Sequence, residues 1–232
     1  MREPRPPQHA SLTLPAWDWL AGYGDLAVEL GGLGVGIARW PRLARGQRVI
    51  ATWLGASAVF DIAALIASRR WHNAQPVARL WFVTCVVLAV EALAAYQHSR
   101  QRAVVLRWLM AGYVIAWLIL VATIEPIDQY STYSAPLHAL VVLGAAVMTV
   151  FRRVSLGRRD LLGDPGFLIG DGLSAYAVPE AFRTLVAQLW SNDLPQRGIL
   201  YYAMSNGVSA LASLVLISAL LVRVAPSLEH ST

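Results

Sequence analysis

Residues 49–67 read VIATWLGASAVFDIAALIA, an uninterrupted apolar run in which Asp61 carries the only charge. An α-helix needs roughly 17 to 25 mostly apolar residues to cross a bilayer, so this run predicts a membrane-spanning helix. Further runs of comparable length are bounded by arginine, proline or polar clusters. Together they predict seven helices: Trp17–Ala38, Val49–Ala67, Arg79–Gln97, Val104–Ile124, Ala135–Phe151, Gly166–Trp190 and Ile199–Val222.

The composition of the whole chain favours a membrane protein. Of its 232 residues, 56% are hydrophobic and 14% are charged, whereas soluble domains are about 25% charged. A chain of this length cannot bury so much apolar surface in one water-soluble core. We therefore expect an all-α, polytopic membrane bundle in residues 16–224, with a short disordered tail over 1–15 and a C-terminal tail over 225–232. The first and sixth runs are the least apolar, and loss of either would reverse one terminus.

The basic residues orient this bundle. All 19 are arginine, and the lack of lysine excludes chemistry that needs a lysine Schiff base. The N-terminus and the second, fourth and sixth connections carry six arginines, whereas the other connections and the C-terminus carry twelve. Because cytoplasmic loops are enriched in arginine, we expect the N-terminus outside and the C-terminus in the cytoplasm of a bacterial-type plasma membrane. The arginines form short clusters, which do not predict a nucleic-acid surface.

Ionisable residues inside the runs are the main candidates for function, because a charge near the bilayer centre costs about 2.5–3.5 kcal/mol even on a lenient scale. Asp18, Asp25 and Glu29 are spaced seven and four residues apart, so they project from one helix face. Asp61 precedes Arg69 by eight residues, which places it roughly 12 Å from the outer end of its helix. These positions predict a polar stripe that faces the inside of the bundle.

Four of these charges are expected to share one depth, namely Glu29, Asp61, Glu180 and Arg183. Glu180 and Arg183 follow Pro179, so they could form a purely structural pair beside a kink. Asp61 has no basic residue within one turn, which favours a functional role. A carboxyl group in such an apolar site keeps its proton near neutral pH and can donate it. Glu91 and Asp171 lie nearer the cytoplasmic ends of their helices.

Aromatic residues also lie deep in the runs, namely Trp53, Phe60, Trp81, Phe82 and Tyr176. Rings that line a cavity can bind an apolar ligand and stabilise a cation, although rings at such positions also fill cores. Gly31, Gly32, Gly34 and Gly36 predict close approach of a neighbouring helix. Cys85 is the single cysteine, which excludes an internal disulfide and a cysteine-based metal site.

Three stretches of the chain, read together, resemble a known family. They are Arg79-Leu80-Trp81-Phe82 with Val86-Val87-Leu88, Tyr133-Ser134-Ala135 leading to Arg152-Arg153, and Gly172-Leu173 leading to Arg183-Thr184-Leu185. They look like the integral membrane terpene cyclases, which include fungal meroterpenoid and indole-diterpene cyclases and bacterial relatives. The resemblance covers most of the chain in topology and implies a seven-helix membrane enzyme.

The resemblance also implies site residues. Phe60-Asp61 is similar to the aromatic–acid pair in the family's second helix, with aspartate in place of the usual glutamate. Cys85 stands where the family has a further acid, and no carboxylate lies near Ser205–Ser209, where its last helix has another. The acids that could replace these two are Glu29, Glu91 and Glu180.

The reaction implied by the resemblance is cyclisation of a linear prenyl chain or its epoxide, started by protonation. Asp61 would donate the proton. The rings of Trp53, Phe60, Trp81, Phe82 and Tyr176 would bind the chain and stabilise the carbocation. No metal and no organic cofactor are expected, and the expected partners are the lipid bilayer and a hydrophobic prenyl-type molecule, with no protein partner identified.

Two other functions fit the intramembrane acids. One is a proton- or cation-coupled transporter or relay, and the other is a non-catalytic subunit of a membrane complex. The surroundings of Asp61 separate the three possibilities. A closed apolar cavity favours the enzyme, a water-filled path through Glu29, Asp61 and Glu180 favours transport, and exposure of these acids on the outer helix surface favours a subunit.

Overall fold

The computed structural model describes residues 16–97, 99–128, 131–157, 160–190 and 195–223, without the side chains of 16–22, 183–190 and 195–205. Apart from the loops that join the helices, this part of the chain is helical, and it contains no strand. Its elements are α1 (Ala16–Arg39), the 3-10 turn η1 (Trp40–Arg42), α2 (Arg45–Trp71), α3 (Gln75–Ala94), α4 (Arg100–Thr123), α5 (Ser134–Ser155), α6 (Pro165–Trp190) and α7 (Pro195–Leu221). The all-α fold and the seven predicted helices are thus confirmed within the described residues.

The helices extend beyond the apolar runs that predicted them. The second helix begins at Arg45 rather than Val49, and the fifth ends at Ser155 rather than Phe151. Arginine is a good helix former, so the helix continues where the apolar run stops. The third helix begins earlier than predicted, at Gln75, because Pro76 lies in its first turn, where the missing N–H costs no helical hydrogen bond.

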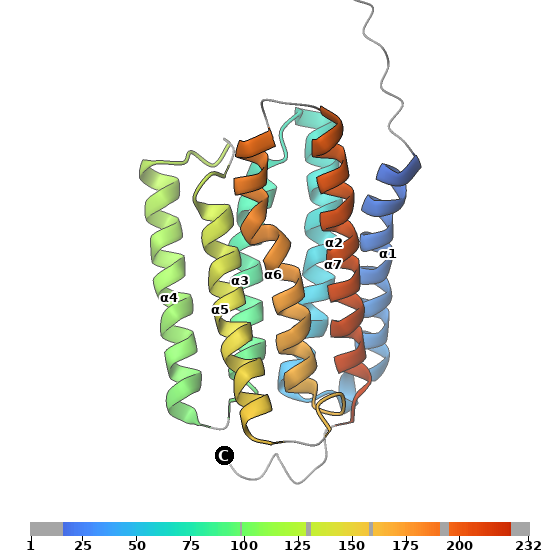
Figure 1. Cartoon of the computed structure of the whole chain (residues 1–232), viewed down its shortest axis with the longest axis vertical. Helices are drawn as coiled ribbons and strands as arrows, with labels where there is room; N and C mark the ends of the chain where they lie inside the picture. The colour runs from blue at the N-terminus through green and yellow to red at the C-terminus, as the bar shows by residue number, and fades with distance from the viewer. Residues whose placement is uncertain (1–15, 98, 129–130, 158–159, 191–194, 224–232) are drawn as a thin grey trace, which may run out of the picture.

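The helices form one antiparallel bundle (Figure 1). Each helix packs against the next one along the chain, and α1 also packs against α7, which closes the bundle. The third helix contacts α5 and α6 as well, whereas α4 packs mainly against α3 and α5 among the described helices. The core between these helices consists of large side chains such as Trp53, Leu54, Ile169, Leu173 and Leu216.

Four helices of the described part are long and apolar enough to cross a membrane, namely α2, α3, α4 and α5. The last helix contributes a shorter apolar segment, Asn206–Leu221. Apolar side chains cover much of the outer surface of α4, where Val105, Trp108 and Ile115 are exposed. These features support a membrane protein. That all seven helices cross the membrane remains a prediction.

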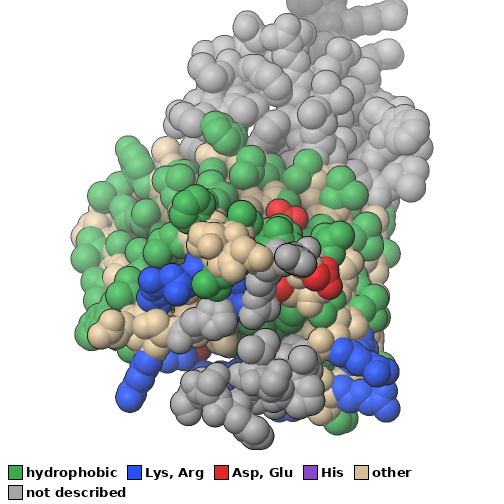
Figure 2. All heavy atoms as spheres, turned by 60° about the horizontal axis from the view of Figure 1, so that its bottom comes forward, with side chains coloured by type: hydrophobic (Ala, Val, Ile, Leu, Met, Phe, Trp, Pro, Cys, Tyr) green, Lys and Arg blue, Asp and Glu red, His purple; other side chains and the backbone are tan. Residues whose placement is uncertain are grey.

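One end of the bundle carries most of the described arginines. We call it the arginine-rich end and define it by Arg39, Arg42, Arg45, Arg48, Arg100, Arg102, Arg107, Arg152, Arg153 and Arg223. Figure 2 shows basic side chains gathered at this end and hydrophobic side chains along the flank of the bundle. The distribution matches the charge bias seen in the sequence, and the orientation in a membrane remains a prediction.

The glycines of α1 allow close helix packing at two of the four predicted positions. A Cβ atom on Gly36 would lie 2.6 Å from the Cβ of Ala51 on α2, and one on Gly32 would lie 2.8 Å from Leu54. A Cβ atom on Gly31 or Gly34 would meet open space. Only one side of the glycine-rich segment is therefore a packing surface.

These two environments predict opposite effects of alanine. Gly36→Ala should destabilise the protein by about 1–3 kcal/mol, because the added methyl overlaps the backbone-anchored Ala51. Gly34→Ala is the matched control and should be neutral or slightly stabilising, because alanine favours helix by about 1 kcal/mol over glycine. Thermal unfolding of the two variants in the same detergent would measure the difference. Equal midpoints for the two variants would contradict this packing.

Candidate functional site

A cavity of about 560 Å³ lies between α1, α2, α3, α6 and α7. Its lining begins near the turn between α2 and α3, where Arg69, Ala74 and Gln75 contribute. It continues to Ser57 near the middle of α2 and to Glu29 on α1. Because a helix rises 1.5 Å per residue, Ser57 and Arg69 are separated by about 18 Å along α2. The cavity therefore occupies the half of the bundle that is remote from the arginine-rich end.

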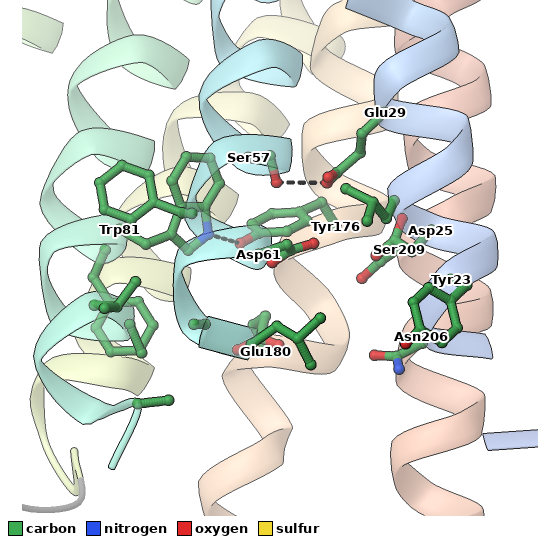
Figure 3. A pocket seen from close by; sticks show the side chains of 18 of the residues that line it. Tyr23, Asp25, Glu29, Ser57, Asp61, Trp81, Tyr176, Glu180, Asn206 and Ser209 are labelled. Atoms are coloured by element: carbon green, nitrogen blue, oxygen red, sulfur yellow. Dashed lines mark hydrogen bonds between the residues drawn. The ribbon is translucent and has the colours of Figure 1, made fainter. Parts of the chain in front are cut away.

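Three carboxyl groups meet on one side of this cavity. Asp25 and Glu29 lie one turn apart on α1 and face Asp61 on α2, and one oxygen from each lies within 4.8 Å of the others. Figure 3 shows Asp25 and Glu29 on the α1 side, with Asp61 between them and the rings of the opposite wall. We call these three residues the carboxyl cluster. Asp61 is exposed in the structure and lines the cavity, so a ligand there could touch it.

Glu29 is the most deeply placed acid of the cluster. Its side chain is only 3% exposed, and the hydroxyl of Ser57 donates a hydrogen bond of 2.5 Å to its Oε1 (Figure 3). Its Oε2 has no hydrogen-bond partner among the described atoms, and neither has Oδ1 of Asp25. Buried polar atoms are normally paired, so these oxygens mark a place where a donor or a cation would be stabilised.

Aromatic rings form the opposite wall. The ring centroid of Trp81 lies 5.5 Å from that of Phe60 and 5.4 Å from that of Trp53. The indole N–H of Trp81 donates a hydrogen bond of 3.1 Å to the hydroxyl of Tyr176 (Figure 3). Trp53 packs edge-on against Tyr176 at 5.1 Å and is 1% exposed, so it supports the wall from behind without lining the cavity. The rings hold one another in place.

Phe82 extends this wall and is fixed from outside the cavity. Its ring stacks on the imidazole of His138 from α5, with centroids 4.3 Å apart and planes inclined by 14°. His138 is fully buried. Helix α5 thus helps to shape the aromatic wall, although none of its residues lines the cavity within the described part of the chain.

The structure brings most of the predicted site residues together. Asp61, Glu29, Glu180, Phe60, Trp81, Phe82 and Tyr176 all line the cavity. Glu91 does not lie there, and forms ion pairs with Arg107 at 2.7 Å and Arg45 at 3.4 Å near the arginine-rich end. The Asp18 and Arg183 side chains lie outside the described residues, so the predicted Glu180–Arg183 pair stays a prediction.

Several lining residues were not singled out by the sequence, namely Tyr23, Ser57, Arg69, Gln75, Asn206 and Ser209. Asp25 was recognised as part of the stripe on the first helix but not as a site residue. The spacing of four residues between Asp25 and Glu29 was the signal that could have included it. The other polar lining residues stand singly in the sequence, so no spacing pattern marks them as members of a site.

Two buried ion pairs lie outside the cavity. Arg79 is fully buried and lies 3.5 Å from the carboxylate of Glu125, whose backbone oxygen accepts a hydrogen bond of 2.6 Å from the same guanidinium. Burial raises the pKa of Glu125, but hydrogen bonds from Tyr133 and Ser134 and the charge of Arg79 outweigh it and hold the pKa below its ordinary value. This network ties the start of α5 to α3.

The second buried pair closes the arginine-rich end. Arg153 lies 3.1 Å from Asp164 and also donates to the backbone oxygen of Tyr96. Asp164 caps α6, because its Oδ1 accepts the N–H of Gly166 at 2.9 Å, and Pro165 starts the helix. The sequence places Arg79 and Arg153 at the ends of apolar runs, where arginine usually faces headgroups, whereas the structure places both side chains in the protein interior.

The chemistry open to the cavity follows from its two walls. The oxygens of the carboxyl cluster could share protons or ligate a hard cation. The rings could hold an apolar ligand or stabilise positive charge. A volume of about 560 Å³ lies within the range of about 300–1,000 Å³ that is usual for small-molecule sites. No protein-family model, curated protein or solved structure matches the chain.

Proposed function

We propose that the protein is an integral membrane enzyme of the terpene cyclase type, which cyclises a prenyl chain or its epoxide by protonation in this cavity. The observation that carries the proposal is the juxtaposition of the carboxyl cluster and the aromatic wall in one cavity. A proton donor and a surface that stabilises a carbocation are the two requirements of such a reaction. The resemblance in sequence supports the same reaction.

In this proposal, Asp61 donates the proton. It transfers the proton from its carboxyl group to an alkene carbon or an epoxide oxygen, and the resulting carbocation is attacked by the next double bond of the chain. Loss of a proton from the cyclic cation to a carboxylate of the cluster ends the reaction and restores the donor. Glu29 lies close enough to Asp61 to return the proton, and the apolar rings limit the access of water to the cation.

We also propose that all seven helices cross the membrane, with the N-terminus outside and the arginine-rich end in the cytoplasm of a bacterial-type plasma membrane. The cavity would then lie in the outer half of the bilayer. A prenyl chain dissolved in the membrane could reach it laterally between helices. The proposed partners are therefore the bilayer and a hydrophobic prenyl-type molecule.

A second candidate function is proton- or cation-coupled transport. It is favoured by the acids Glu29, Asp61 and Glu180, which line one cavity. Transport also needs a continuation toward the arginine-rich end, whereas the described lining ends near Glu29 and Ser57. The subunit hypothesis is less well supported, because these acids line a cavity between helices together with aromatic side chains.

Co-expression with enzymes that make polyprenyl chains of several lengths tests the proposed function. Cells that contain the protein should accumulate a cyclic isomer of one chain, detected by mass spectrometry and NMR of lipid extracts. The Asp61→Asn protein is the control, expressed at the same level. Identical extracts from both strains, with and without supplied polyprenyl epoxides, would count against an enzyme of this type.

The aromatic wall gives a separate prediction. Trp81→Leu should lower the rate of product formation about tenfold or more and change the ratio of products, because one face that stabilises the carbocation is lost. Trp108→Leu is the matched control, since Trp108 is 73% exposed on α4. Chromatography of products from both variants measures the ratio. An unchanged rate and product ratio in Trp81→Leu would show that this ring does not contact the substrate.

A further inference from the structure

The cavity has an imbalance of charge. Among its described lining residues, the carboxyl cluster contributes three acids, Asp25, Glu29 and Asp61, and Arg69 is the single basic residue. Arg69 follows Asp61 by two helical turns, at roughly 12 Å along α2. Like charges inside an apolar bundle are costly unless they are neutralised or paired. The carboxyl cluster therefore requires protons or a bound cation.

Two carboxylate oxygens without a hydrogen-bond partner indicate where that cation would lie. Oε2 of Glu29 and Oδ1 of Asp25 are buried without a hydrogen-bond partner among the described atoms. Ser57 already satisfies the other oxygen of Glu29. A positive charge placed between Glu29, Asp25 and Asp61 would neutralise these carboxylates, since one oxygen from each lies within 4.8 Å of the others.

The rest of the cavity determines what kind of cation fits. A small inorganic ion would satisfy the carboxyl cluster but would leave most of the volume of about 560 Å³ unfilled. The opposite wall presents Phe60, Trp81 and Tyr176, and aromatic faces attract organic cations and cover their apolar groups. An anion is disfavoured by the same acids.

We propose that this cavity binds a lipophilic organic cation, an amine or quaternary ammonium ion with apolar substituents. Its nitrogen lies beside the carboxyl cluster, and its apolar groups lie against the rings of Phe60, Trp81 and Tyr176. This inference does not rest on the proposed reaction, because it requires only the charges and rings of the cavity. It adds a ligand class that a neutral prenyl chain does not cover.

Binding to the full-length protein in lipid nanodiscs tests the inference. The probe is benzyltrimethylammonium, and the matched neutral probe is neopentylbenzene, which has the same shape without the charge. Isothermal titration should give one saturable site for the cation and at least about tenfold weaker binding of the neutral probe. Empty nanodiscs correct for partitioning into lipid. Equal affinities for the two probes, or no saturable binding of the cation, would overturn the inference.

Variants locate the site. Glu29→Gln and Trp81→Leu should each weaken binding of benzyltrimethylammonium at least about tenfold, whereas Glu29→Asp should retain most of it because the charge remains. Asp171→Asn and Trp108→Leu, both at exposed positions, should bind as the wild type does. Wild-type affinity in Glu29→Gln, or displacement of the probe by Na⁺ or Ca²⁺ at equal concentration, would contradict the proposed ligand. Binding of the cation without any cyclisation would leave this inference intact and reject the proposed reaction.

Discussion

Membranes that contain Asp61→Asn are expected to form at least about 100-fold less cyclic product than wild-type membranes at the same protein level. An amide has the shape of the carboxyl group but cannot donate its proton to an alkene or epoxide. Asp61 is also the acid of the carboxyl cluster with an exposed side chain that lines the cavity. The measurement is the initial rate of product formation from a supplied polyprenyl epoxide, followed by gas chromatography.

Two variants control this result. Asp171→Asn makes the same chemical change at an exposed position on α6 and should leave the rate unchanged. Asp61→Glu retains a carboxyl group and should keep part of the activity, because the acid is displaced but not removed. A wild-type rate in Asp61→Asn would exclude Asp61 as the proton donor and would leave Glu29 as the candidate donor.

The second large effect concerns stability. Arg79→Met should destabilise the protein by about 3–5 kcal/mol, because it leaves the carboxylate of Glu125 buried without its cation. Glu125→Gln should also destabilise the protein, because its single amide oxygen can replace only one of the two oxygens that accept from Tyr133 and Ser134, and Arg79 stays buried without its anion. Thermal unfolding in detergent, followed by circular dichroism, measures both variants.

The partly exposed pair Glu91–Arg107 provides the comparison for this prediction. Glu91→Gln should cost at most about 1 kcal/mol, because exposed ion pairs contribute little. If Arg79→Met unfolded at the same temperature as Glu91→Gln, the network at Glu125 would not be a structural anchor. The burial of the two pairs is therefore what the experiment compares.

Glu125 also predicts a dependence of stability on pH. Its pKa in the folded protein lies below its ordinary value, because its hydrogen bonds and Arg79 together outweigh the effect of burial. It therefore contributes stability above the pKa of the unfolded chain, about 4.3, and this contribution is lost as the pH falls through the lower folded value. Unfolding temperatures measured between pH 7 and pH 3 should fall more steeply for the wild type than for Glu125→Gln.

Much of the fold was predictable because a bilayer imposes length and polarity on each helix. The apolar run around Asp61 and the other six apolar runs predict the seven helices correctly. The differences are confined to the positions at which the helices begin and end. Polar helix ends explain these differences, since turns such as those at Arg45 and Gln75 are helical although they are not apolar. The glycines of α1 predict that a neighbouring helix approaches closely. The sequence does not show that Gly36 rather than Gly34 faces Ala51 on α2.

The site was predictable where depth alone decides which residues meet. Glu29, Asp61 and Glu180 were expected at one depth, and all three line the cavity. Direction is harder to predict than depth, because a charge near a helix end can turn toward water or toward a buried partner. Arg79 turns inward to Glu125, whereas Glu91 pairs with Arg107 near the arginine-rich end. The partner of neither side chain can be predicted without the positions of the neighbouring helices.

The most direct test of the proposed function uses purified protein in lipid nanodiscs with a single linear polyprenyl epoxide. Cyclisation started by protonation conserves every atom of the substrate. The proposal therefore predicts a product of unchanged mass that contains fewer double bonds by NMR, formed by the wild type and not by Asp61→Asn. Recovery of the unchanged linear epoxides across a range of chain lengths, from protein that binds benzyltrimethylammonium in the same preparation, would contradict it.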